Sequence, residues 1–183
     1  MRLFVAVAIP VQVREAVTRA VEDLHALSPA GLRWADPERW HLTLAFFGEV
    51  QDARLDELTR RLARAAGRHR APVLRIEQAG RFGGRVLWAR IVEAQESDHV
   101  LSGLADSVAA AARRTGIAQE ERSYRPHLTL ARSQSNVDLR PLVDALAGLR
   151  SDSWTAHEVL LVRSRLGPHP EHTTLRAFAL SAQ

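Results

Sequence analysis

The sequence contains no cysteine and no lysine, and all 25 of its Lys/Arg-type residues are arginine. Without cysteine there are no disulfides, no thiolate metal ligands and no cysteine nucleophile. Without lysine, no lysyl side chain can carry an adenylate or a Schiff base, and no P-loop lysine can reach the phosphates of ATP. ATP-driven chemistry through a lysine is therefore excluded. The absence of cysteine fits a cytoplasmic protein, which is the location we expect.

Long apolar runs and low-complexity linkers are also missing. No run approaches the roughly 20 residues of a membrane-spanning helix, and a strand-like segment begins at residue 2, so we expect no signal peptide, anchor or membrane partner. The 183 residues are 46% hydrophobic, enough for one compact domain or for two small lobes with cores of their own. The formal net charge of +4 allows an anionic partner such as nucleic acid, although arginine-rich codon usage explains it equally well.

One five-residue sequence, His-Leu-Thr-Leu-Ala, occurs at residues 41–45 and again at residues 127–131. We interpret the repeat as an internal duplication, and its alternating pattern predicts a β-strand in each copy. Successive side chains of a strand point to opposite faces, so each histidine shares a face with the threonine two residues later, while the leucines face a core. The two copies therefore present His41 beside Thr43 and His127 beside Thr129.

Strand and helix patterns alternate along the rest of the chain. The expected strands are residues 2–9, 32–34, 41–48, 72–79, 85–92, 127–131, 155–163 and 174–181. The expected helices are residues 11–27, 52–66 with Asp52 as the N-cap, 99–114 and 139–149. Residues 80–84 read as a hairpin connection, and residues 166–172 read as a polar loop. The pattern predicts one α+β domain, residues 1–183, made of two similar lobes.

Two histidines on duplicated strands suit the hydrolysis of a cyclic phosphodiester. That reaction needs a base that deprotonates water on one side of phosphorus, and an acid that protonates the leaving ribose oxygen on the opposite side. Imidazole titrates near neutral pH, so one histidine can be the neutral base and the other the charged acid. The threonine hydroxyls can donate to non-bridging phosphate oxygens. The scheme requires no metal and no cofactor, and the residues alone leave the order of the two histidines open.

The motifs together resemble the 2H phosphoesterase superfamily. The second motif is preceded by Tyr124 and Pro126 and followed by Arg132. Residues 2–6, 41–48, 86–88 and 124–132 are similar, in the same order, to the bacterial and archaeal RNA 2′,3′-cyclic phosphodiesterases, first named as 2′-5′ RNA ligases (LigT-like). The resemblance implies a bilobed fold, in which two antiparallel sheets flank a central cleft and the helices lie outside. It also implies that His41 is the proton donor and His127 the proton acceptor.

The implied activity is metal-independent opening of a terminal 2′,3′-cyclic phosphate of RNA to a 2′-phosphomonoester. Three alternatives stay open. The first is the reverse reaction, ATP-independent joining of a cyclic phosphate end to a 5′-hydroxyl through a 2′-5′ bond. The second keeps the mechanism but acts on small cyclic nucleotides, and the third is an RNA-binding module without chemistry. The expected partner is RNA with a cyclic phosphate end, such as a tRNA fragment, and we expect a monomer.

Three further residues are candidate contacts for the phosphate or the RNA. In a regular strand Arg132 would lie on the face opposite His127, so we weigh a structural ion pair against a phosphate contact. Phe82 and Tyr124 can stack on a base, as aromatic residues of RNA-binding proteins do, or belong to the core. Trp34 and Trp40 flank a turn, and we expect them to pack.

The remaining histidines and arginines receive a simpler interpretation. His157, His169 and His172 suggest metal binding by type, but they lack a third partner at suitable spacing, so we read residues 169–172 as a solvated loop. Relatives often carry a Gly-x-x-Tyr pattern in this last loop, where the present sequence has Glu-His-Thr at residues 171–173. The arginines between residues 60 and 70 are read as a solvated helix face, with nucleic-acid contact as the alternative.

Overall fold

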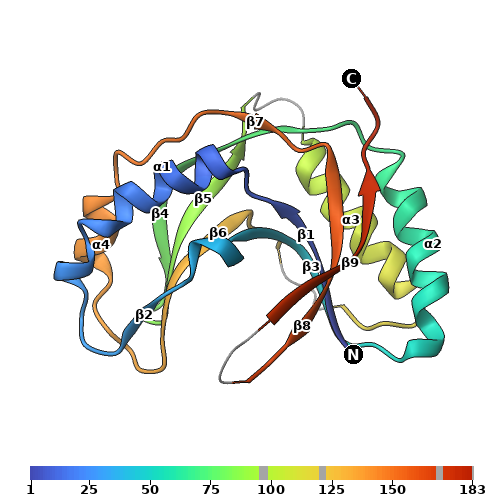
Figure 1. Cartoon of the computed structure of the whole chain (residues 1–183), viewed down its shortest axis with the longest axis horizontal. Helices are drawn as coiled ribbons and strands as arrows, with labels where there is room; N and C mark the ends of the chain where they lie inside the picture. Colours follow the sequence, from blue (N-terminus) through green and yellow to red (C-terminus); the bar gives the residue numbers. More distant parts are fainter. Residues whose placement is uncertain (95–98, 120–122, 168–170, 183) are drawn as a thin grey trace.

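The computed structural model describes residues 1–94, 99–119, 123–167 and 171–182, which form two antiparallel sheets (Figure 1). The first sheet has the order β3-β1-β8-β9, with β1 at Arg2–Ala8, β3 at His41–Glu49, β8 at Glu158–Arg165 and β9 at Glu171–Ala179. The second has the order β2-β6-β5-β4-β7, with β2 at Leu32–Trp34, β4 at Val73–Phe82, β5 at Val86–Glu93, β6 at His127–Ser133 and β7 at Trp154–Thr155. The predicted α+β fold with two antiparallel sheets is confirmed.

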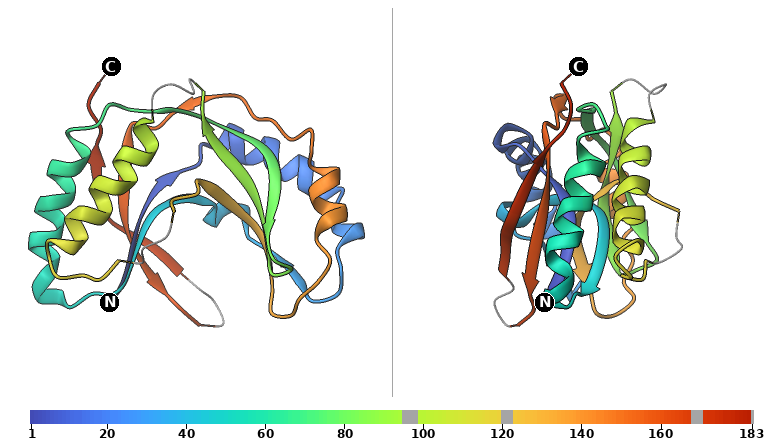
Figure 2. Two further views of the ribbon diagram at one scale, coloured as in Figure 1. Left: turned by 180° about the vertical axis from the view of Figure 1, so that it is seen from behind. Right: turned by 90° about the vertical axis from the view of Figure 1, so that its right-hand side faces the viewer.

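Helices cover the outer side of the arch that the sheets form (Figures 1 and 2). They are α1 (Val11–Glu22), α2 (Leu55–Ala66), α3 (Val100–Arg113) and α4 (Arg140–Ala145). Helices α2 and α3 lie against the first sheet, whereas α1 and α4 lie against the second (Figure 1). Helix α1 follows β1 directly but packs on the other sheet. Each sheet together with its helices, which we call a lobe, is therefore built from segments that alternate along the chain. No helix in the described ranges is long and apolar enough to cross a membrane.

The helix boundaries differ from the predicted ones at three places. The predicted helix 11–27 ends as α1 at Glu22 and is followed by a 3₁₀ turn, His25–Leu27. Asp52 is not an N-cap, because it opens a separate 3₁₀ turn, Asp52–Arg54, and α2 begins at Leu55 without a side-chain cap. The predicted helix 139–149 forms only at Arg140–Ala145, after which the chain turns back toward β4.

Several strand boundaries also differ, because strand pairing decides them. The hairpin connection is shorter than residues 80–84, since β4 continues to Phe82 and β5 begins at Val86. The predicted strand 155–163 is divided between the sheets, with β7 pairing with β4 and β8 pairing with β1. The last strand begins at Glu171, so the predicted polar loop does not include its final residues.

Each copy of the repeated sequence contains a β-bulge at its Leu-Ala end. In β3, paired with β1, Leu44 is the extra residue between the partners Ala45 and Thr43. In β6, paired with β5, the partners step from Ala131 to Thr129, so that Leu130 is the extra residue. Both leucines and Ala131 are buried in the core, and the partly buried Ala45 packs against it. An extra residue reverses the alternation of a strand, so the residue after each alanine turns to the face of the histidines.

Candidate active site

The two motif histidines are held in the same way. Nδ1 of His41 lies 2.7 Å from the carbonyl oxygen of Arg39, and Nδ1 of His127 lies 2.6 Å from that of Arg125. A carbonyl oxygen can only accept a hydrogen bond, so Nδ1 carries the hydrogen in both imidazoles. The Nε2 atom of each ring is therefore the one that can release or take up a proton. The geometry is the same in both motifs, because the backbone partner is in each case the arginine two residues before the histidine.

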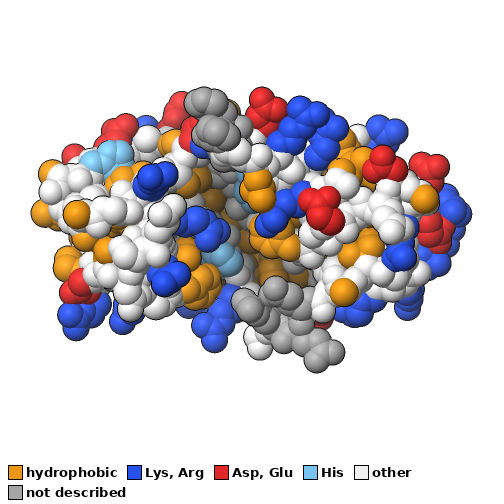
Figure 3. Space-filling view, turned by 90° about the horizontal axis from the view of Figure 1, so that it is seen from below, with side chains coloured by type: hydrophobic (Ala, Val, Ile, Leu, Met, Phe, Trp, Pro, Cys, Tyr) orange, Lys and Arg blue, Asp and Glu red, His pale blue; other side chains and the backbone are white. Residues whose placement is uncertain are grey.

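The motif strands come together where the two sheets meet. Strands β3 and β6 are in contact, and the Tyr124 hydroxyl donates a hydrogen bond to the carbonyl oxygen of Thr43, at 3.3 Å, from the segment that precedes β6. The charge of His127 contributes to lowering the pKa of His41, so the two imidazoles interact electrostatically. The molecular surface is hollowed between the lobes, with histidine on its floor and arginine around it (Figure 3). Both histidines and both threonines are partly exposed there.

Two aromatic rings surround His127. The Phe82 ring meets the His127 ring edge-on, with centroids 5.1 Å apart, and Trp88 lies 6.2 Å away. Phe82 and Trp88 also contact each other, at 5.2 Å. The position of Trp88 depends on Gly80 in the neighbouring strand, where a Cβ atom would lie 2.3 Å from the indole ring. The structure thus places Phe82 at the site, and adds Trp88, which the sequence analysis did not single out.

A second set of rings surrounds His41. Phe4 lies 4.8 Å and His172 5.3 Å from the His41 ring, and these two neighbours lie 5.1 Å apart. Phe46, on the same face because of the β3 bulge, lies 5.5 Å from Phe4 and is 56% exposed. The prediction that His172 belongs to a solvated loop is therefore wrong. It is the second residue of β9, and the pairing of β9 with β8 brings it to His41.

Arg132 lies on the same face as His127, which corrects the expectation for a regular strand. The bulge at Leu130 reverses the alternation, and the Arg132 guanidinium donates to the Thr129 hydroxyl at 3.4 Å. Tyr124 is half-buried, and its hydroxyl donates to the Thr43 carbonyl oxygen, which links the segment before β6 to β3; stacking of its ring on a base stays a prediction. Burial raises its pKa well above the ordinary value, which keeps the phenol a neutral donor.

Electrostatics favour the uncharged form of His41 in the absence of a ligand. Burial lowers its pKa below the ordinary 6.5, and the hydrogen bond to the Arg39 carbonyl only partly opposes this. The positive charges of His172, Arg132 and His127 lower the pKa further. The pKa of His172 is also lowered, first by burial and then by the charge of Arg39. An anion bound between these groups would offset their repulsion and raise the pKa of His41.

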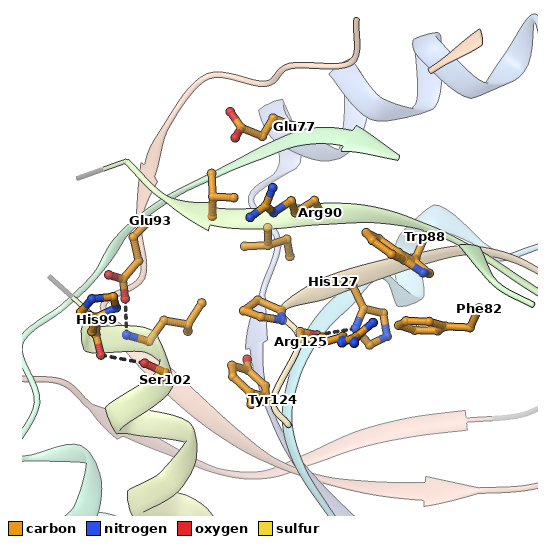
Figure 4. Close-up of a pocket in the computed structure, with 14 residues that line it drawn as sticks. Glu77, Phe82, Trp88, Arg90, Glu93, His99, Ser102, Tyr124, Arg125 and His127 are labelled. Carbon is orange, nitrogen blue, oxygen red and sulfur yellow. Dashed lines mark hydrogen bonds between the residues drawn. The ribbon is translucent and has the colours of Figure 1, made fainter. Parts of the chain in front are cut away.

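A cavity of about 480 Å³ opens beside His127. It runs from Phe82 and Trp88 past Tyr124 and along β5 to the first turn of α3, where Ser102 lies (Figure 4). Its volume falls within the range of pockets that hold small organic ligands. The site therefore offers two imidazoles, two threonine hydroxyls and a guanidinium beside a cavity of nucleotide size.

The described residues contain no group of three or more His, Asp or Glu side chains that could hold a metal ion. Of the three histidines considered for metal binding, His157 is exposed and directly precedes β8, and His169 lies outside the described residues. The third, His172, belongs to the ring cluster around His41. The metal-free mechanism stays a prediction, which chelation tests below.

Comparison with known proteins agrees with the geometry. Residues 9–168 match the family described as the 2′-5′ RNA ligase superfamily. The chain belongs to this superfamily. Its homologues are cyclic phosphodiesterases, which hydrolyse phosphodiester bonds, and the chain belongs to the same enzyme class.

Individual relatives extend over nearly the whole chain. A Thermus thermophilus protein named RNA 2′,3′-cyclic phosphodiesterase is 32% identical over 100% of this chain and 92% of its own length. A Geobacillus stearothermophilus protein of the same name is 27% identical over 97% of this chain, which spans only 56% of that longer relative. Among solved structures, Escherichia coli LigT complexed with 3′-AMP superposes with a TM-score of 0.79 at 27% identity, covering 98% of both chains.

Proposed function

We propose that the protein is an RNA 2′,3′-cyclic phosphodiesterase that opens a terminal cyclic phosphate to a 2′-phosphomonoester. The observation that carries this proposal is the matched pair of histidines, each anchored through Nδ1 and each leaving Nε2 available in one hollow. The names of the relatives support the choice of substrate, because several relatives in bacteria and archaea carry the name RNA 2′,3′-cyclic phosphodiesterase. The bound 3′-AMP of E. coli LigT supports a nucleotide ligand.

In the proposed reaction, His127 Nε2 removes a proton from a water molecule as its oxygen attacks phosphorus. The P–O3′ bond breaks, and His41 Nε2–H donates its proton to the leaving 3′-oxygen, which leaves the phosphate on the 2′-oxygen. Thr43 and Thr129 donate hydrogen bonds to the non-bridging oxygens and hold the phosphate between the imidazoles. After release of the product, His127 returns its proton to solvent, and His41 takes up a proton from solvent when the next substrate binds.

The proton donor must be charged, whereas ligand-free His41 favours its neutral form. The cyclic phosphate carries one negative charge and would lie against His41, so substrate binding raises the pKa of the acid. Substrate binding is therefore linked to proton uptake. The positive groups around His41 lower its pKa in the free protein, but the bound anion offsets their charge, so His41 can still be protonated during catalysis.

The pH profile gives the first test of this assignment. We expect kcat/KM to be bell-shaped, with one of its two limbs set by loss of the His41 proton in the free enzyme. The charges facing His41 come from His172 on β9 and from Arg132 and His127 on β6. Because His172 lowers the pKa of His41, the change His172→Gln should move the limb set by His41 to higher pH by about half a unit. Initial rates between pH 4.5 and 9 measure the shift.

The matched control for this experiment is His157→Gln, which removes an exposed histidine remote from the site. It should leave both limbs in place. If neither limb moves to higher pH in His172→Gln, His172 does not act on the proton donor.

The proposed activity is tested with an oligonucleotide that ends in a 2′,3′-cyclic phosphate, incubated with the protein in excess EDTA. We expect full hydrolysis with the chelator present, because no step uses a metal. Phosphorus NMR or phosphatase mapping of the product should show a 2′-phosphate. Loss of activity in EDTA that added metal restores would refute the metal-free mechanism, and a 3′-phosphate product would reverse the regiochemistry.

The same experiment separates the alternatives. Addition of a second RNA with a 5′-hydroxyl end tests the reverse reaction, since a 2′-5′ joined product would appear without ATP. Hydrolysis of cyclic mononucleotides at rates above those of oligonucleotides would favour small nucleotides as the substrate. RNA that binds but stays closed would favour the binding-module alternative.

A further inference from the structure

Two arginines of the second sheet lie directly opposite each other. Arg33 of β2 and Arg132 of β6 are cross-strand partners in antiparallel register. Cross-strand partners point to the same face of a sheet, so Arg33 shares the cleft face that the β6 bulge gives to Arg132. Both side chains are exposed. On the other side of Arg132 the partner in β5 is Val86, which carries no charge.

In the described ranges, neither guanidinium forms an ion pair with a carboxylate. Arg132 donates to the Thr129 hydroxyl, and within the part of the chain that the structure describes no hydrogen bond is found for the Arg33 side chain. Like charges directly opposite each other destabilise a pair of strands. A pair of this kind at an active site becomes favourable when an anion lies between the two charges.

The location of the pair defines which anion it would take. Arg132 reaches the catalytic threonine Thr129, so its guanidinium adjoins the position proposed for the cyclic phosphate. Arg33 lies one strand further from that position, on the edge strand β2. The pair therefore extends the phosphate site from β6 toward the edge strand β2. In an RNA that ends in a cyclic phosphate, the nearest other phosphate is the one on the 5′ side of the terminal nucleotide.

We infer that Arg33 and Arg132 form a second anion subsite, which binds the 5′-phosphate of the nucleotide that carries the cyclic phosphate. The inference rests on the proposed function and extends it to a preference for oligonucleotides and 5′-phosphorylated nucleotides over plain cyclic nucleosides. Arg132 contributes to both phosphates, whereas Arg33 serves the second phosphate alone. Arg33 is thus a specificity-determining residue for chain length.

The test compares adenosine 2′,3′-cyclic phosphate with the same compound carrying a 5′-phosphate. The two substrates differ only in the group that the subsite binds. We expect the wild type to prefer the 5′-phosphorylated substrate, and Arg33→Gln to reduce this preference about tenfold, the effect of one charge-assisted hydrogen bond. For a cyclic-ended oligonucleotide, the slope of log KM against log salt should fall by roughly 0.7 in the variant.

The exposed Arg64 of α2, on the outer side of the first sheet, supplies a control with the same charge change. Arg64→Gln should keep both substrate preference and salt slope. Relief of the like-charge contact also predicts that Arg33→Gln melts about 1–2 °C above the wild type in low salt without ligand.

The outcomes are distinct. A preference for the 5′-phosphate that survives Arg33→Gln, or is absent from the wild type, overturns the subsite while leaving the phosphodiesterase intact. A lower melting temperature of the variant overturns it as well, because it would make Arg33 a structural residue. Failure of the wild type to open the cyclic-ended oligonucleotide as well as both mononucleotides refutes the proposed function instead.

Discussion

Replacement of either His41 or His127 by alanine is expected to lower kcat on a cyclic-ended RNA by about 10²–10⁴-fold, the usual contribution of a positioned acid or base. Each substitution removes the only ring nitrogen that can exchange a proton at its side of the phosphate. Because the two groups act in one concerted step, the double variant should be scarcely slower than the slower single variant. Single-turnover rates at saturating substrate measure these losses.

Asparagine at the same positions separates the two ring nitrogens. Its side-chain amide can donate to the carbonyl oxygen that anchors Nδ1, but it places no titratable group where Nε2 lies. His127→Asn should therefore be as slow as His127→Ala while matching the wild type in melting temperature. The remote His157→Ala should retain the wild-type rate. A His127→Asn protein with substantial activity would contradict the assignment of Nε2 as the base.

Replacement of Thr129 by valine is expected to lower kcat/KM about 10²-fold, comparable to the loss of one preorganised donor to a charged oxygen. Valine keeps the branched shape of threonine and its preference for strands, so the loss reports on the hydroxyl. Thr43→Val should cause a loss of the same order, because the repeat gives both threonines the same place beside their histidines. Steady-state kinetics on a cyclic-ended oligonucleotide give the comparison.

Serine restores the donor without the methyl group, so Thr129→Ser should recover most of the lost activity. Thr155→Val, in β7 at the far edge of the second sheet, is the control for a lost hydroxyl elsewhere. If Thr129→Val retained the wild-type kcat/KM, the hydroxyl would have no part in holding the phosphate, and Arg132 would be left as the main phosphate contact in that lobe.

Local sequence was sufficient for the centre of the site. The repeated His-Leu-Thr-Leu-Ala sequence predicts a strand. Because side chains alternate along a strand, each histidine lies beside its threonine whichever strand pairs with it. The structure bears out this arrangement in β3 and β6, and it confirms the α+β fold with helices outside two antiparallel sheets. Such features depend on residues two positions apart, which the sequence alone specifies.

Other parts of the site depend on pairing between distant segments. His172 reaches His41 only because β9 pairs with β8 and β8 with β1. Trp88 enters the site where β4 supplies a glycine opposite it. Neither neighbour is visible from local periodicity, because the partner lies elsewhere in the chain.

The β-bulges show most clearly which features depend on local sequence and which depend on strand pairing. The sequence assigns Arg132 to the wrong face, since alternation in an isolated strand has no reason to break after Thr129. The break arises because β6 must match the register of β5 while Leu130 and Ala131 both remain in the core. The sequence thus determined the chemical groups and their local spacing. The tertiary structure decided which face Arg132 occupies and which residue lies opposite it, because register is a property of two strands together.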